Sequence, residues 1–234
     1  MALGVHSEVG RLRKVMVHRP GLEHTRLTPS NAEELLFDDV IWVSRAKQEH
    51  DRFVEVMRER GVEVYEVETL LTEALDQPGV RDWIADHVLS EREVGIKAAD
   101  RARDWACTQP AALVAEFLIG GITRADVDQD VGLVWESADP NSMLLPPLPN
   151  FLFQRDCSCW IYGGVTINPM TKPARVPETK IVEAVYRFHP MFAGEEFPIW
   201  LGGSDEDWGR CHVEGGDVQP IGNGTVMIGM GERT

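Results

Sequence analysis

Two stretches in the C-terminal third repeat one arrangement, an aspartate followed by an apolar strand, a tight turn and a returning strand. In FLFQRDCSCWIYGGVTIN, Asp156 precedes the first strand and Gly163-Gly164 marks the turn. In EGGDVQPIGNGTVMIG, Asp217 stands in the same relation to the turn at Asn223-Gly224. Between them, apolar residues at helical spacing over residues 177–188 predict a helix. Strand-rich units joined by helices favour a pseudosymmetric α/β array whose acids approach a shared axis.

The opening of the chain predicts strand, helix, strand. The apolar run KVMVH at residues 14–18 is typical of a buried strand, and VEVYEV at residues 62–67 alternates with a period of two. Between them, apolar residues recur at steps of three and four from Trp42 to Arg60, and Gly61 occupies the position of a C-cap glycine. This order requires a crossover connection, so we expect a mixed α/β domain.

A helical insertion is predicted between these two regions. Strand signals are missing from about residue 70 to 131, and Val80, Ile84 and Val88 form a helical stripe. Ser90 and Glu93 have the spacing of a capping box. A further helix is expected from Pro110 to the glycine pair at 120–121. The proline-rich LLPPLPN then marks the return to strand structure, which divides the chain at 1–70, 71–143 and 144–234.

Composition excludes several classes of function. The 234 residues are 43% hydrophobic, which is enough for a sizeable core, and no stretch has the apolar length of a signal peptide or membrane span. The formal net charge of -15 disfavours nucleic acid and anionic membranes as partners and suits a cationic small molecule. We therefore expect a cytoplasmic protein. Its four cysteines lack CxxC spacing, which favours reduced thiols, and Cys157-x-Cys159 is more typical of two strand thiols than of a metal site.

Strand alternation sorts the side chains near the two acids. If residues 155–160 form a strand, Asp156 lies on the face of Ser158 and Trp160, opposite the neighbouring thiols. If residues 211–214 form another, His212 lies with Glu214 and opposite Cys211. No cysteine then shares a face with the acids, which argues against a thiol nucleophile here, and Cys107 falls in the helical block. We interpret His212 as a hydrogen-bonded strand histidine rather than a base.

At these residues the chain resembles a known family. The motifs LPNFLFQRDCS, HVEGGDV and GMGERT, with ELLFDD and EHDRF nearer the N-terminus, are similar to those of bacterial-type arginine deiminases, in the same order. That family belongs to the guanidino-group-modifying pentein superfamily. The resemblance implies a five-bladed α/β-propeller, incomplete in this chain, with an all-helical insertion. It also implies hydrolysis of L-arginine to L-citrulline and ammonia through a covalent Cys-amidino intermediate, with no metal or organic cofactor.

The resemblance assigns roles to particular residues. Asp156 is expected to bind the substrate guanidinium, and Glu214 to pair with the catalytic histidine and the substrate. Arg175 and Arg233 match the arginines that hold the α-carboxylate. The further matches are Asn150 near the α-amino group, Phe153 in the same motif, and Asp217 as a structural acid behind the site. Carboxylates suit this task because bidentate hydrogen bonds fix the plane of a guanidinium and the position of its carbon.

The family's nucleophilic cysteine, catalytic histidine and second guanidinium-binding aspartate lie beyond the GERT motif. We therefore expect this chain to be an N-terminal portion that is inactive alone and associates through exposed sheet edges, and the complete protein to be a homo-oligomer. Alternatives remain open: an agmatine deiminase, an amidinotransferase, a dimethylarginine hydrolase, or a non-catalytic binding or interaction module. The two arginines argue against agmatine, which lacks a carboxylate, and the helical insertion argues against the shorter dimethylarginine hydrolases.

Overall fold

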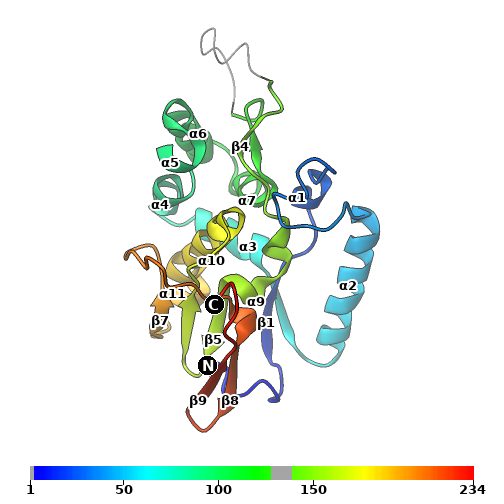
Figure 1. The fold of residues 1–234 in the computed structure, drawn as a ribbon, viewed down its shortest axis with the longest axis vertical. Helices are drawn as coiled ribbons and strands as arrows, with labels where there is room; N and C mark the ends of the chain where they lie inside the picture. Colours follow the sequence, from blue (N-terminus) through cyan, green and yellow to red (C-terminus); the bar gives the residue numbers. More distant parts are fainter. Residues whose placement is uncertain (1–2, 128–138) are drawn as a thin grey trace.

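A computed structural model describes residues 3–127 and 139–234 (Figure 1). The strands are β1 (Lys14–Val17), β2 (Glu63–Glu66), β3 (Ile122–Thr123), β4 (Met143–Leu145), β5 (Ser158–Ile161), β6 (Gly164–Ile167), β7 (Ile199–Gly202), β8 (Val218–Gly222) and β9 (Thr225–Ile228). The α-helices are α1 (Leu22–Thr25), α2 (Val43–Glu59), α3 (Val67–Leu75), α4 (Val80–His87), α5 (Glu91–Val94), α6 (Ile96–Thr108), α7 (Ala111–Gly120), α9 (Gln154–Cys157), α10 (Val176–Phe188) and α11 (Pro190–Ala193). Three 3-10 turns are η1 (Pro149–Leu152), η2 (Pro173–Arg175) and η3 (Gly215–Asp217).

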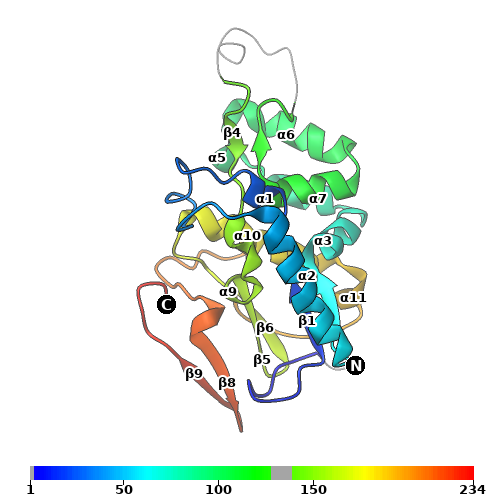
Figure 2. The same cartoon turned by 90° about the vertical axis from the view of Figure 1, so that its right-hand side faces the viewer.

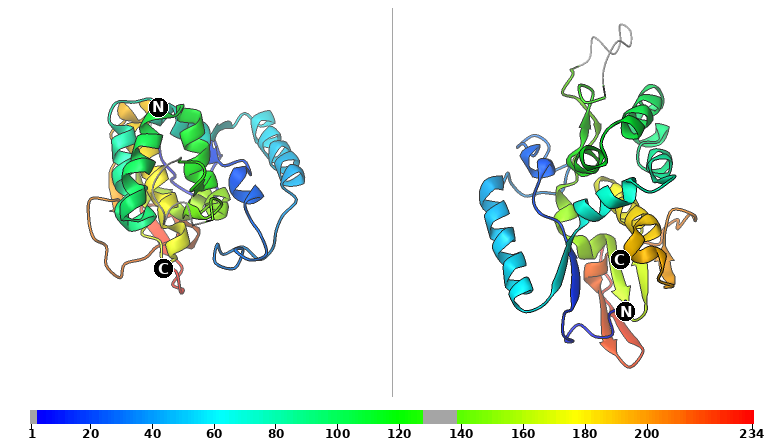
Figure 3. Two further views of the ribbon diagram at one scale, coloured as in Figure 1. Left: turned by 90° about the horizontal axis from the view of Figure 1, so that it is seen from above. Right: turned by 180° about the vertical axis from the view of Figure 1, so that it is seen from behind.

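The expected strand–helix–strand opening is confirmed. Strands β1 and β2 pair in parallel, and α2 makes the crossover between them. Helix α2 buries Val54 and Met57 against the strands. It ends before Gly61, whose φ of 76° is the left-handed conformation that suits a C-cap glycine. Figure 3 shows α2 at one side of the molecule, apart from the helices of residues 67–120.

Helices α3 to α7 form the helical block, at the opposite end of the molecule from the β8–β9 hairpin in Figures 1 and 2. The stripe of Val80, Ile84 and Val88 is buried as expected. Ser90 is the N-cap of α5, as the capping box predicts, but its hydrogen bonds are wrong: the Ser90 side chain makes no capping bond, and the Glu93 carboxylate lies 3.1 Å from Lys180 Nζ. The block is not all-helical as expected, because β3 lies within it and pairs antiparallel with β4. Residues 128–131, the end of the expected block, lie outside the described residues.

The two predicted hairpins are present. Strands β5 and β6 pair antiparallel, and α10 then returns the chain so that β7 lies parallel to β6. Strands β8 and β9 form the second hairpin, with Asn223 and Gly224 both at positive φ in its turn. The first unit is therefore strand, strand, helix, strand, and the second matches it in its hairpin.

The architecture is mixed α/β, with helices packed around small sheets that do not close into a ring within the described residues. One large hydrophobic cluster includes Leu71 of α3, Leu118 of α7, Val165 of β6 and Val182 of α10. The helical block and the first hairpin unit therefore share a core. Among the described residues, no helix combines the length and apolar character of a membrane span.

A buried polar cluster fixes the turn after β1. The Glu23 Oε1 atom accepts hydrogen bonds from His18 Nε2 at 3.1 Å, His24 Nδ1 at 2.6 Å and the Gly21 amide at 2.6 Å. Burial alone would raise the pKa of Glu23, but the bonds from the two histidines outweigh it and hold this pKa well below its usual 4.5. The ionised carboxylate therefore organises the turn.

We expect Glu23→Gln to lower the free energy of unfolding by about 3 kcal/mol at pH 7, because it replaces a buried carboxylate that accepts three hydrogen bonds with a neutral amide. A depressed carboxyl pKa stabilises the fold above the unfolded value of 4.5 and loses that effect as pH falls below it. The gap between wild type and variant should therefore shrink below about pH 4.5. Urea unfolding across pH measures this. Glu63→Gln, which removes an exposed partner of Lys14, is the control and should leave stability nearly unchanged.

Candidate functional site

Asp156 lies in the short helix α9, directly before β5, and not in a strand. Its amide donates to the Phe153 carbonyl at 3.2 Å, so the chain is still turning at this point. The expected face shared by Asp156, Ser158 and Trp160 is therefore wrong for the acid. Ser158 and Trp160 do share a face, since both contact Tyr186.

Residues 212–214 are also not a strand, because the chain reaches β8 only after the 3-10 turn η3. His212 consequently shares no strand face with Glu214. Its Nδ1 atom is buried without a hydrogen-bond partner, which corrects its interpretation as a bonded strand histidine. The two acids of the repeat still correspond, since Asp156 and Asp217 each lie in a short helical turn just before a hairpin.

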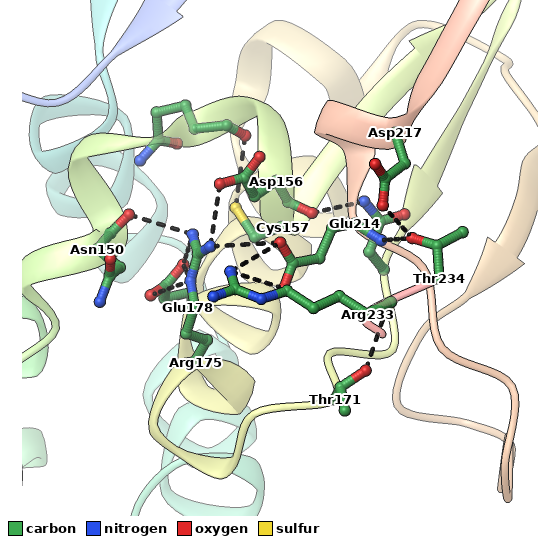
Figure 4. A network of polar contacts seen from close by, with 12 residues as sticks. Asn150, Asp156, Cys157, Thr171, Arg175, Glu178, Glu214, Asp217, Arg233 and Thr234 are labelled. Carbon is green, nitrogen blue, oxygen red and sulfur yellow. Dashed lines mark hydrogen bonds and ion pairs between the residues drawn. The ribbon is translucent and has the colours of Figure 1, made fainter. Parts of the chain in front are cut away.

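Arg175 lies at the centre of the site and joins four segments of the chain (Figure 4). Its Nε atom lies 3.1 Å from each carboxylate oxygen of Glu178, and its Nη2 atom donates to Glu178 Oε2 at 2.8 Å. The Nη1 atom donates to Asp156 Oδ2 at 2.9 Å and lies 3.9 Å from Glu214 Oε2. The Nη2 atom also donates to the Asn150 carbonyl at 3.2 Å. Three carboxylates therefore surround one guanidinium whose side chain is 2% exposed.

Burial and pairing act against each other in this cluster. Burial works to lower the pKa of Arg175, but its bonds to Glu178 and Asp156 outweigh burial and raise that pKa, so the guanidinium stays charged. Burial raises the pKa of the Glu178 carboxyl above its usual 4.5, and the bonds and charge of Arg175 act against that shift and favour the carboxylate. Both side chains thus depend on their partner for ionisation.

Arg233 approaches the cluster from the other side of Glu214. Its Nη1 atom lies 3.3 Å from Glu214 Oε2, and its side chain is 44% exposed. Thr234 Oγ1 donates to Asp217 Oδ2 at 2.6 Å and accepts from the Glu214 amide at 3.1 Å. Asp217 therefore supports the backbone beside Glu214 through Thr234.

Asn150 and Phe153 lie at the border of the cluster. The Asn150 amide donates to the Leu35 carbonyl at 2.6 Å, so this side chain holds the loop before α2. Phe153 is 49% exposed. The structure thus brings Asp156, Arg175 and Glu214 together, with Arg233 beside them, whereas Phe153 touches this group through its backbone carbonyl, which accepts from the Asp156 amide.

Two hollows flank the cluster. One, of about 310 Å³, is lined by Glu214, Gly216, Asp217 and Gly231 to Arg233. The other, of about 430 Å³, is lined by Asp156 with Met16, His18, Phe53 and Phe153 among others. Asp156 and Glu214 face the same nitrogen of Arg175 but line different hollows.

None of the four cysteines is suited to act as a nucleophile in this cluster. Cys157 lies beside it, but burial and then the Glu178 charge raise the pKa of its thiol well above the usual 9.0. Burial likewise raises the pKa of Cys159, which bonds Thr166. Cys107 lies in α6, and Cys211 borders neither hollow described above. Within the described ranges, no group of histidine, cysteine and acidic residues has the geometry of a metal site.

A family model described as arginine deiminase matches residues 33–234. The chain belongs to the arginine deiminase family. The match includes every residue to which the resemblance assigned a role, and membership implies an enzyme that acts on arginine. The member of the cluster that sequence reasoning missed is Glu178. Its signal was available, because Glu178, Ile181, Val182 and Val185 lie at steps of three and four on the buried face of one helix.

The glycine pair in HVEGGD allows η3 to pack against α9. A Cβ atom on Gly215 would lie 2.0 Å from the Arg155 carbonyl oxygen, a contact that only backbone movement relieves. A Cβ atom on Gly216 would lie 2.9 Å from Asp156 Oδ1. Close approach of the two backbones therefore places Glu214 beside Asp156.

We expect Gly215→Ala to lower the free energy of unfolding by about 2 kcal/mol, since overpacking forces the backbone to shift. Gly163→Ala is a matched control in the first hairpin turn, where an added Cβ meets nothing within 4 Å. That variant should change stability by about 0.5 kcal/mol or less. Denaturant unfolding followed by circular dichroism compares them, and equal stabilities would contradict the close-approach argument.

Proposed function

We propose that this chain supplies the substrate-orienting carboxylates of an enzyme that hydrolyses L-arginine to L-citrulline and ammonia. The observation that carries the proposal is the convergence of Asp156 and Glu214 on a single guanidinium nitrogen, Nη1 of Arg175, at 2.9 and 3.9 Å. Two carboxylates from separate segments can take the N–H groups of a planar cation in fixed directions. This arrangement would hold the guanidinium carbon in place for attack.

The proposed reaction proceeds through a thiolate attack on that carbon, departure of ammonia, and hydrolysis of the resulting Cys-amidino intermediate. We assign the roles of nucleophile and catalytic histidine to no residue of the Arg175 cluster. The raised thiol pKa of Cys157 and Cys159 supports this, because a buried thiol among carboxylates resists ionisation.

Arg233 is the proposed partner of the substrate's α-carboxylate. Its partly exposed guanidinium lies at an open hollow and beside Glu214, so an anion in that hollow can reach it. Arg175 was expected to share this role, but its nitrogens already contact Glu178, Asp156, Glu214 and Asn150. That role would require Arg175 to exchange partners. Asn150 and Phe153 are proposed contacts near the α-amino end.

The fold proposed for the family is a five-bladed α/β-propeller. The β5–β6–α10–β7 unit and the β8–β9 hairpin support it as successive repeats. We retain residues 1–70 and 144–234 as propeller segments and 71–143 as the helical insertion. The shared hydrophobic core means that the insertion packs directly on the propeller unit.

We expect Asp156→Asn and Glu214→Gln each to weaken arginine binding about tenfold, the cost of losing one charged hydrogen-bond acceptor. Asp51→Asn is the control, because Asp51 also pairs with an arginine, Arg19, at 2.6 and 2.8 Å but outside the site. Calorimetric titration with arginine measures all three. Equal affinities of the site variants and the control would count against the proposal.

We also expect the chain to form no citrulline from arginine, because none of its cysteines lies at the guanidinium site with a thiol that ionises readily. A colorimetric citrulline assay with excess protein tests this. Turnover abolished by Cys157→Ser would show that the thiol assignment is wrong.

A further inference from the structure

The Arg175–Glu178 pair is the most deeply buried ion pair of the cluster. The Arg175 side chain is 2% exposed and that of Glu178 is 0% exposed. The two residues are three positions apart at the start of α10, where Arg175 is the N-cap, and three hydrogen bonds join them. Removing two charges from water is costly, and well-packed apolar residues often replace such a pair without loss of stability. The stability of the fold is therefore a weak explanation for this ion pair. The neighbouring carboxylates of Asp156 and Glu214 suggest a functional explanation.

Charge balance around Arg175 points to that reason. Arg175 Nη1 lies against Asp156 and near Glu214, the two carboxylates proposed to bind a cation. Without Glu178, the two positive charges of Arg175 and of Arg233, which lies 3.3 Å from Glu214, would together balance these same two carboxylates. A second guanidinium would then meet carboxylates that are already neutralised, beside a buried cation of its own sign.

Geometry adds a second constraint. Because both Glu178 oxygens contact Nε and one also contacts Nη2, the plane of the Arg175 guanidinium is fixed on that edge. Only the Nη1 corner faces Asp156 and Glu214. The direction of Nη1 therefore sets where the carboxylate oxygens of Asp156 and Glu214 lie.

We propose that Glu178 is a positioning residue, which neutralises Arg175 and fixes its plane so that Asp156 and Glu214 keep a net negative charge for the substrate guanidinium. The inference rests on the proposed function of this site and deepens it. In this proposal, Arg175 is a counter-ion for carboxylates of the protein, and it does not bind the carboxylate of the substrate.

The test uses methylguanidinium, which has the charged group of arginine and no carboxylate. NMR-detected titration of the full chain should show that Glu178→Gln weakens methylguanidinium and arginine binding alike, each by about tenfold or more. If arginine binding fell while methylguanidinium binding stayed unchanged, Arg175 would be acting on the carboxylate and the proposal would be overturned.

Matched variants separate charge, geometry and stability. Glu183 is another buried glutamate of α10, and its carboxylate lies 2.7 Å from Arg187 Nε, outside the Arg175 cluster. Glu183→Gln should therefore leave both affinities unchanged. Glu178→Asp keeps the charge but shortens the side chain, so it should recover only part of the affinity lost in Glu178→Gln. Full recovery would remove the geometric half of the proposal, and a loss in Glu183→Gln equal to that in Glu178→Gln would overturn it.

A readout without ligand keeps this result distinct from failure of the proposed function. The Arg175 Nε–H signal, assigned with Arg175→Lys, should exchange slowly in wild type and Glu183→Gln and be broadened or lost in Glu178→Gln. If wild type bound neither ligand but the signal still depended on Glu178, the proposed function would fail while the placement of Arg175 stood. If Glu178→Gln changed neither the signal nor the affinities, the positioning role would be refuted.

Discussion

A single buried guanidinium holds this site together. Arg175 joins the start of α10, the carbonyl of Asn150 in η1, the acid of α9 and, at longer range, Glu214 before η3. These segments come from different parts of the sequence. Each contributes a carboxylate or carbonyl oxygen that needs a hydrogen-bond donor because it is buried from solvent. The cation therefore explains why the acids can lie so close together. A cluster of carboxylates without it would repel itself and take up protons.

Glycine supplies the remaining constraint on the site. The acids of HVEGGD are separated by two residues without side chains because η3 passes directly over the Arg155 carbonyl and the Asp156 carboxylate. Arg155 strengthens the same junction by donating to the carbonyls of Gly215 and Val218. Contact between the two hairpin units thus depends on backbone groups, while their acidic side chains remain available to the polar network.

Much of the fold follows from periodicity. The parallel β1–β2 pair, the crossover helix, both hairpins and α10 were predictable because their apolar residues repeat at strand or helix spacing. The failures lie in short segments. At Asp156 and at residues 212–214, a local turn replaces the expected strand, and four residues are too few for alternation to tell these apart. The hydrogen bonds of the Ser90 capping box were wrongly predicted because Lys180, distant in sequence, takes the Glu93 carboxylate.

The chemistry of the site was predictable in residue type but not in pairing. Motifs identified Asp156, Glu214 and Arg175. Sequence spacing alone does not show that Nε and Nη2 of Arg175 bond Glu178. The helical face of α10 marked Glu178 as buried, and a buried carboxylate requires a cation, but the nearby sequence offers Lys180, Arg187 and Arg175 as candidates. The tertiary fold decides which cation pairs with Glu178. Lys180 lies against Glu93 and Arg187 against Glu183, which leaves Arg175, of these three, beside Glu178. Which arginine binds a ligand therefore follows from which carboxylates are already paired.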